Sequence, residues 1–210
     1  MGEARLNQRI GLATANSVTG PWTRRDSPIL EPRPGAWDAL MTNNPAPHVL
    51  PDGGGVLLVY KSTHHEGDLL RLGVAGARNP EGPYERLRKD PIFHFGDARD
   101  ALEDPYVWWE GSRFQMIMKD ISGGIGGEPG AGIHATSRDG KHWTISEPPH
   151  AYALGILFAD GSRPSFARVE RPQLIVEDGV PTVLFVAVAD GVTSSPTAKA
   201  WNQAIPLERA

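Results

Sequence analysis

Two short phrases alternate along this chain, and each recurs about every sixty residues. The first joins a Gly-x-Ala segment to a turn and an aromatic residue, with copies at 10–22, 72–84 and, more loosely, 132–143. The second is a polar or charged residue before proline, and its copies are separated by 60 and 67 residues: Asn44-Pro45, Asp104-Pro105 and Arg171-Pro172. Two phrases in fixed alternation indicate one structural unit repeated along the chain.

The repeated unit has the features of a β-sheet. A period near sixty is far longer than that of ankyrin-type helical repeats and suits a four-stranded propeller blade with long connections. Apolar runs of strand-forming residues follow Asp-Gly or Glu-Gly turns within 52–60, 110–118 and 178–188, which indicates the second strand of a hairpin. No segment has helical periodicity over three turns. We predict an all-β chain of propeller-type, four-stranded antiparallel blades.

The repeats divide the 210 residues, which we expect to form a single domain, into blade remnants. Two full copies are expected at 42–95 and 102–147 and a third at 166–207, whereas 9–30 supplies the last two strands of a copy. Residues 31–41 and 145–166 are expected to be loops. About three blades are too few for an ordinary closed ring, which takes about four to eight. We expect the open edges to be covered by residues 9–16 pairing with the last blade, by self-association into a homo-oligomer, or by both.

Charge and composition exclude several classes of partner. The net charge is −4 with both signs interspersed, so neither nucleic acid nor an acidic membrane surface is an expected partner. Cysteine is absent, which excludes disulfides and thiolate sites. No signal peptide is visible in the sequence, and the longest apolar run, 183–189, is too short to cross a membrane. We expect a soluble protein of unassigned location.

Candidate catalytic residues lie at the starts of the first strands. In a propeller these strands line the central channel, so their first residues converge at one mouth. The positions hold Glu103 with Asp104 and Glu170 with Arg171, preceded in the first copy by Asn43 and Asn44. Glycoside hydrolysis needs one carboxyl that donates a proton and another that is ionised. Crowding of like charges is one way to raise the pKa of the acid. The catalytic candidates are therefore Glu103, Asp104 and Glu170.

Other residues are candidates for binding sugar. Six side chains could bond hydroxyl groups, and Trp108 offers an apolar face to a sugar ring: Asn43, Asn44, Lys61, His65, His134 and Arg171. The acids before proline have a structural alternative as turn anchors or salt-bridge partners, tryptophans often pack between blades, and His65 has the alternative of a solvated loop residue. Carboxylates of Asp104 and Glu170 could also hold a hard cation such as Ca²⁺. No cofactor is required by these residues.

Taken in order, the phrases resemble those of the five-bladed β-propeller glycoside hydrolases of family 43 over nearly the whole chain. The matching segments are Ile10-Gly-Leu-Ala with Gly20-Pro-Trp22, Asn44-Pro-Ala-Pro-His48 with Asp52-Gly53, Glu103-Asp-Pro-Tyr106, Ser137-Arg-Asp-Gly140 with Trp143, and Glu170-Arg-Pro-Gln173. The resemblance implies that Glu103 is the general acid and that neutral Asn44 stands where an aspartate tunes it. The general base has no counterpart, which implies an N-terminally truncated propeller.

Three functional hypotheses follow from the resemblance and its gaps. The first is a glycoside-hydrolase-derived propeller with little or no hydrolase activity that retains carbohydrate or cation binding, since losing a general base costs about 10²–10⁴ in rate. The second is an active glycosidase whose carboxylate site is rebuilt from Glu103, Asp104 and Glu170 or across a subunit interface. The third is a structural fragment without a ligand.

Overall fold

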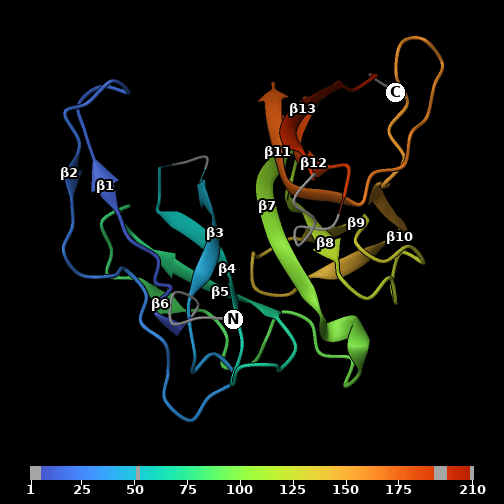
Figure 1. Ribbon diagram of the computed structural model, residues 1–210. Coiled ribbons are helices and arrows are strands. Elements are labelled where there is room, and N and C mark those ends of the chain that lie inside the picture. The colour runs from blue at the N-terminus through green and yellow to red at the C-terminus, as the bar shows by residue number, and fades with distance from the viewer. Residues whose placement is uncertain (1–5, 51–52, 192–197, 209–210) are drawn as a thin grey trace.

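Antiparallel β-sheets make up nearly all of the regular structure in the computed structural model, which describes residues 6–50, 53–191 and 198–208 (Figure 1). Within these ranges the helical structure is one 3-10 turn, η1 (Ala98–Asp100), with no α-helix. The predicted all-β class is confirmed. None of the helical structure described is long and apolar enough for a membrane span.

The two full repeats form four-stranded sheets, as predicted, and each follows the chain from strand to adjacent strand. The first sheet has the order β3 (Asn43–Val49), β4 (Val56–Ser62), β5 (Arg71–Ala77) and β6 (Glu85–Arg86). The second has the order β7 (Leu102–Glu110), β8 (Arg113–Asp120), β9 (Gly132–Ser137) and β10 (Thr144–Tyr152). Within the described residues the third sheet has three strands, β11 (Arg168–Glu177), β12 (Val180–Ala189) and β13 (Ala200–Pro206).

The first strands of the three sheets lie together at the centre of the molecule. Strand β7 lies between β3 and β11 and contacts both (Figure 1). The remaining strands of each sheet lead away from this line. This radial order is typical of propeller blades, and it brings the starts of all three first strands to one place.

Apolar side chains fill the spaces between neighbouring sheets. Between the first and second sheets lies a core that includes Val59, Val74, Met116, Met118 and Ile133, all fully or nearly fully buried. A separate core joins the second sheet to the third and includes Trp108, Ile117, Val169, Leu184 and Val186. Burial of the apolar faces that neighbouring sheets turn toward each other therefore holds the sheets side by side.

The N-terminal segment covers the outer face of the first sheet. Strand β1 (Ala13–Thr14) pairs with β2 (Thr23–Arg24), and Ile10 bridges Leu30. Ile10 and Leu30 pack on Leu58 and Tyr60 of β4. The expectation that residues 9–16 pair with the last blade is therefore wrong, because these apolar side chains are buried against the first sheet instead.

Strand β10 is longer than expected. It continues through 145–152, which the sequence analysis assigned to the end of a blade and a loop. Two register shifts against β9 accompany the prolines Pro148 and Pro149. Proline is tolerated here because β10 is an edge strand and the irregular register leaves these positions outside the regular ladder. The end of the strand was not predicted from the sequence, because two adjacent prolines usually indicate a loop.

The third sheet is apolar on both faces. Leu184, Val186 and Val188 point into the core shared with the second sheet. On the opposite face, Phe185 and Ile175 keep 37% and 44% of their surface exposed. An exposed apolar sheet face is a common site of association. Self-association remains a prediction.

Candidate functional site

Each first strand has a β-bulge at its X-Pro phrase. The pairing register with the second strand shifts after Asn43, Glu103 and Glu170. Asn44, Asp104 and Arg171 have φ angles of 46°, 52° and 55°. Left-handed backbone is readily adopted by Asn and Asp, but it costs about 1–2 kcal/mol for most other residues. The bulge also accommodates proline, which cannot donate to the ladder. The three repeats thus turn two adjacent side chains toward the centre in the same way.

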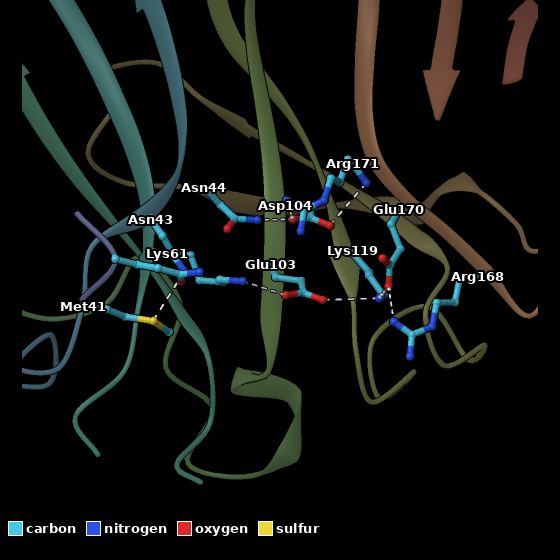
Figure 2. A network of polar contacts seen from close by, with 11 residues as sticks. Met41, Asn43, Asn44, Lys61, Glu103, Asp104, Lys119, Arg168, Glu170 and Arg171 are labelled. Atoms are coloured by element: carbon cyan, nitrogen blue, oxygen red, sulfur yellow. Dashed lines mark hydrogen bonds and ion pairs between the residues drawn. The ribbon is translucent and has the colours of Figure 1, made fainter. Parts of the chain in front are cut away.

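Five charged side chains of alternating sign cross the centre of the molecule (Figure 2). Lys61 Nζ lies 2.8 Å from Glu103 Oε2, and Lys119 Nζ lies 3.3 Å from Glu103 Oε1. Lys119 also bonds Glu170, whose Oε1 lies 3.7 Å from Arg168 Nη1. We call this row, Lys61–Glu103–Lys119–Glu170–Arg168, the charged row. It links all three sheets by ion pairs.

Asp104 forms a second link beside the charged row. Its Oδ1 accepts hydrogen bonds from Asn44 Nδ2 and, at 3.4 Å, from Arg171 Nη1, and its Oδ2 accepts from the Arg171 backbone N–H at 3.2 Å. The Asp104 side chain is 3% exposed, whereas that of Arg171 is 63% exposed. Asp104 is therefore bonded directly to the bulge residues of both other repeats (Figure 2).

The adjacent carboxyls Glu103 and Asp104 have pKa values shifted in opposite directions. Burial opposes ionisation of Glu103, but Lys61 and Lys119 outweigh burial and lower its pKa. Burial raises the pKa of Asp104, the negative charge of Glu103 adds to this, and the Arg171 and Lys61 cations only partly offset it. Glu103 is therefore held ionised, while Asp104 retains a proton more readily than an ordinary aspartate.

Most candidates from the sequence come together here. Seven of them lie in the charged row, in the Asp104 cluster or beside them: Asn43, Asn44, Lys61, Glu103, Asp104, Glu170 and Arg171. Lys119 and Arg168 were not among the residues predicted from the sequence. Lys119 could have been found, because it pairs with Glu103 as Lys61 pairs with Asn43 and so occupies the same position of the repeat. No repeated position in the sequence indicated that Arg168 would lie at this site.

Two binding candidates, Trp108 and His134, lie instead at a cavity of about 210 Å³ between the second and third sheets. Their ring centroids are 5.8 Å apart, and burial lowers the pKa of His134. Tyr152 lines the same cavity, and burial together with the nearby carboxylates of Asp104 and Glu170 raises its pKa. Within the described residues, Trp108 Nε1 and Tyr152 Oη are buried without a hydrogen-bond partner.

Neither a protein-family model nor a curated protein matches this chain, but solved structures do. A family 117 glycoside hydrolase from the marine bacterium Zobellia galactanivorans superposes with a TM-score of 0.65 at 18% identity, over 97% of this chain and 53% of that one. A thermostable family-43 glycoside hydrolase gives 0.60 at 14% identity, over 95% and 62%. An exo-β-1,3-galactanase from Phanerochaete chrysosporium gives 0.58 at 14% identity, over 94% and 41%.

The fold is that of the propeller-type glycoside hydrolases. This chain spans 41–62% of the length of these three proteins. At such low sequence identity the likeness establishes the fold alone. The activity of the glycoside-hydrolase propellers is therefore not carried over to this chain.

His65, the remaining binding candidate, lies apart from the centre of the molecule. Its ring lies against that of His64, with centroids 3.8 Å apart, in the loop after β4. Its backbone N–H donates to Asp68 Oδ2 at 3.0 Å. The His65 side chain therefore belongs to the rim of the first sheet and not to the charged row.

The acids at the centre of the molecule are paired with cations. Among the described residues there is no group of three or more His, Asp or Glu side chains arranged to hold a metal ion. The Asp104 carboxylate contacts Asn44 and Arg171, and Glu170 contacts Lys119 and Arg168. A bound Ca²⁺ at Asp104 and Glu170 would have to displace these partners, and it remains an untested prediction.

Proposed function

We propose that this chain is a carbohydrate-binding protein on a glycoside-hydrolase propeller, with little or no hydrolase activity. The observation that carries this proposal is the pair of lysines on Glu103. The family resemblance implies that Glu103 stands at the general-acid position, which must hold a proton to protonate the leaving oxygen. Lys61 and Lys119 favour the ionised form instead, so the inherited acid is poorly suited to its step.

The partner carboxylate of such an acid is also lacking. An inverting mechanism needs a base about 6.5–9.5 Å across the scissile bond. The resemblance assigns no residue of this chain to that base. Glu170, an acidic residue of the third sheet, shares Lys119 with Glu103. An acid and a base joined through one ammonium group leave no gap for a sugar and a water.

Carbohydrate binding, by contrast, is supported by the partly exposed charged groups at the centre of the molecule. Glu103 and Glu170 keep 17% and 20% of their side chains exposed, and Arg171 keeps 63%. Fixed carboxylates and cations at one surface supply both acceptors and donors, which vicinal sugar hydroxyls need. We therefore expect an oligosaccharide to bind at the charged row without being cleaved.

A second candidate function has its own observation. The opposite pKa shifts of Glu103 and Asp104 are those of a base and an acid, respectively. An active glycosidase could use Asp104 as the proton donor, although its side chain is 3% exposed. This alternative requires the bulge at Asp104 to open toward substrate.

Turnover and binding assays separate the two candidates. Aryl glycosides and natural oligosaccharides are assayed for cleavage, and the same oligosaccharides are titrated by calorimetry, with the protein and its Glu103→Gln and Asp104→Asn variants. We expect saturable binding without turnover. Turnover abolished by either variant, but not by the control Glu81→Gln at an exposed site, would establish the rebuilt enzyme. Neither binding nor turnover would leave the structural fragment.

A further inference from the structure

Two adjoining hollows lie beside the first sheet, and both are lined by Ala36, Trp37 and Arg71. We call them the Trp37 hollows. Their volumes are about 570 and 320 Å³. Both values fall in the range of roughly 300–1,000 Å³ found for ligand pockets. The hollows are thus large enough for one or two sugar rings.

Trp37 is held in place at the wall between the hollows. Its ring stacks on Tyr60, with centroids 6.0 Å apart and an interplanar angle of 17°. Its Nε1 donates to the backbone oxygen of Lys89 at 3.1 Å. The tryptophan therefore needs little ordering on binding, and the ring surface turned away from Tyr60 can meet the C–H face of a sugar.

Polar groups around the tryptophan are positioned by a buried acid. The Asp100 side chain is fully buried, and its Oδ2 lies 3.3 Å from Arg71 Nε and 2.9 Å from His94 Nδ1. These contacts involve Nε of Arg71 and Nδ1 of His94, so neither uses the two terminal nitrogens of Arg71 or the second ring nitrogen of His94. His94 lines the smaller hollow together with Arg71. A fixed guanidinium fork suits neighbouring hydroxyl oxygens.

The charges around the smaller hollow are balanced. Arg71 and Lys89 are opposed by Asp90 in its wall and by Asp100 behind it. An anionic ligand would gain little from such a site, whereas a neutral sugar uses donors and acceptors together. The balance therefore favours a neutral saccharide over an acidic one.

The Trp37 hollows lie at the same end of the first sheet as the charged row. In the β3–β4 and β4–β5 pairings, Asn43 faces Lys61 and the next residue, Ser62, faces Arg71. We propose that the Trp37 hollows form a second binding site for a neutral saccharide, with the ring stacked on Trp37 and its hydroxyls bonded by Arg71 and His94. This site takes its ligand class from the proposed function, and it is a separate place of binding.

Matched tryptophan variants test the second site. Neutral xylo-, arabino- and galacto-oligosaccharides and acidic oligogalacturonides are titrated by calorimetry into the protein, Trp37→Ala, Trp37→Phe and Trp22→Ala. Trp22 is 58% exposed just before β2 and lines neither hollow, so its variant controls for the loss of a surface tryptophan. We expect about tenfold weaker binding of a neutral oligosaccharide with Trp37→Ala and a smaller loss with Trp37→Phe. Circular dichroism checks that each variant is folded, and His94→Ala provides a variant outside the core.

The outcomes separate this site from the charged row. Binding weakened by Trp37→Ala and His94→Ala but not by Glu103→Gln supports the second site and contradicts the proposed central one. Binding weakened by Glu103→Gln alone overturns the second site and keeps the proposed function. A preference for oligogalacturonides, or no binding of any neutral oligosaccharide up to about 10 mM, also overturns this proposal.

Discussion

Lys119 Nζ lies 3.3 Å from Oε1 of Glu103, its cross-strand neighbour, and the same ammonium group bonds Glu170 of the third sheet. One lysine therefore pairs with two carboxylates from different sheets. The Lys119 side chain is 12% exposed, so water can do little to replace it. This contact joins the second and third sheets at Glu103, the residue that the resemblance places at the general-acid position.

Replacing Lys119 with Met is expected to destabilise the protein by about 3 kcal/mol at pH 7, because two partly buried acids lose their shared cation. The lowered pKa of Glu103 means that its pairing stabilises the fold above the unfolded pKa of about 4.3 and that this contribution is lost as the pH falls through the folded value. The stability difference should therefore shrink on acidification. Urea denaturation at several pH values measures it, with exposed Lys141→Met as the control. A difference that grows toward low pH would contradict the pairing.

The two adjacent carboxyls should titrate in opposite directions from their ordinary values. Carbon-13 NMR titration should find the pKa of Glu103 below that of an ordinary glutamate and the pKa of Asp104 above that of an ordinary aspartate. Lys61→Met should raise the pKa of Glu103, because one of its two cations is removed. An unchanged Glu103 pKa in this variant would show that the 2.8 Å contact does not control ionisation.

The raised pKa of Asp104 has the opposite consequence for stability. A carboxyl with a raised folded pKa contributes most below its unfolded pKa of about 3.9, and the contribution is lost as the pH rises through the folded value. Asp104→Asn keeps a residue suited to a φ of 52° and removes the buried charge. We expect it to cost less than about 1 kcal/mol at pH 7, and less than Glu103→Gln. Thermal unfolding compares the two variants, and a larger loss for Asp104→Asn would refute the prediction.

Arg171 is the one bulge residue of the three whose side chain does not favour its backbone conformation. Arg171→Asn should stabilise the fold by about 0.5–1 kcal/mol relative to Arg171→Ala, because Asn tolerates a φ of 55° and Ala does not. Both variants lose the 3.4 Å contact with Asp104, so their difference isolates the backbone effect. Equal urea midpoints for the two variants would show that the bulge carries no strain at this position.

Asp38 is expected to be the most damaging acidic residue to remove outside the charged row. It is fully buried and accepts hydrogen bonds from Tyr60 Oη at 2.9 Å, Arg33 Nε at 2.8 Å and Arg86 Nε at 2.6 Å. Asp38→Ala leaves two arginines without their carboxylate, which should cost about 3–5 kcal/mol in chemical denaturation. Exposed Asp26→Ala should change stability by less than about 0.5 kcal/mol. Comparable losses in both variants would contradict the assignment.

Self-association can be tested at the exposed face of the third sheet. Phe185 and Ile175 lie there with 37% and 44% of their surface exposed. If a second copy covers this face, sedimentation should find an oligomer that Phe185→Lys dissociates and Val18→Lys, at another exposed apolar residue, does not. A stable folded monomer of the unaltered chain would refute the homo-oligomer.

Sequence periodicity was sufficient to predict the sheets, because a strand that buries one or both faces must carry an apolar pattern that can be read locally. The second strands at β4, β8 and β12 were found in this way. The end of β10 was not, since Pro148 and Pro149 are local signals against a strand and only the bulged pairing with β9 admits them. The packing partner of residues 9–16 depended on which apolar sheet face was uncovered in the folded molecule, and local sequence patterns do not show this.

The sequence by itself determined that two or more acids converge on one place, because a repeated X-Pro position in a radial array of sheets must come to the centre. Only the tertiary structure decided which cations pair with those acids and how readily each acid ionises. Lys119 and Arg168 come from a second strand and from a strand start beside Glu170, and their distances to the acids depend on how the sheets pack. Ionisation follows from distance and burial, so the lowered pKa of Glu103 and the raised pKa of Asp104 exist only in the folded arrangement.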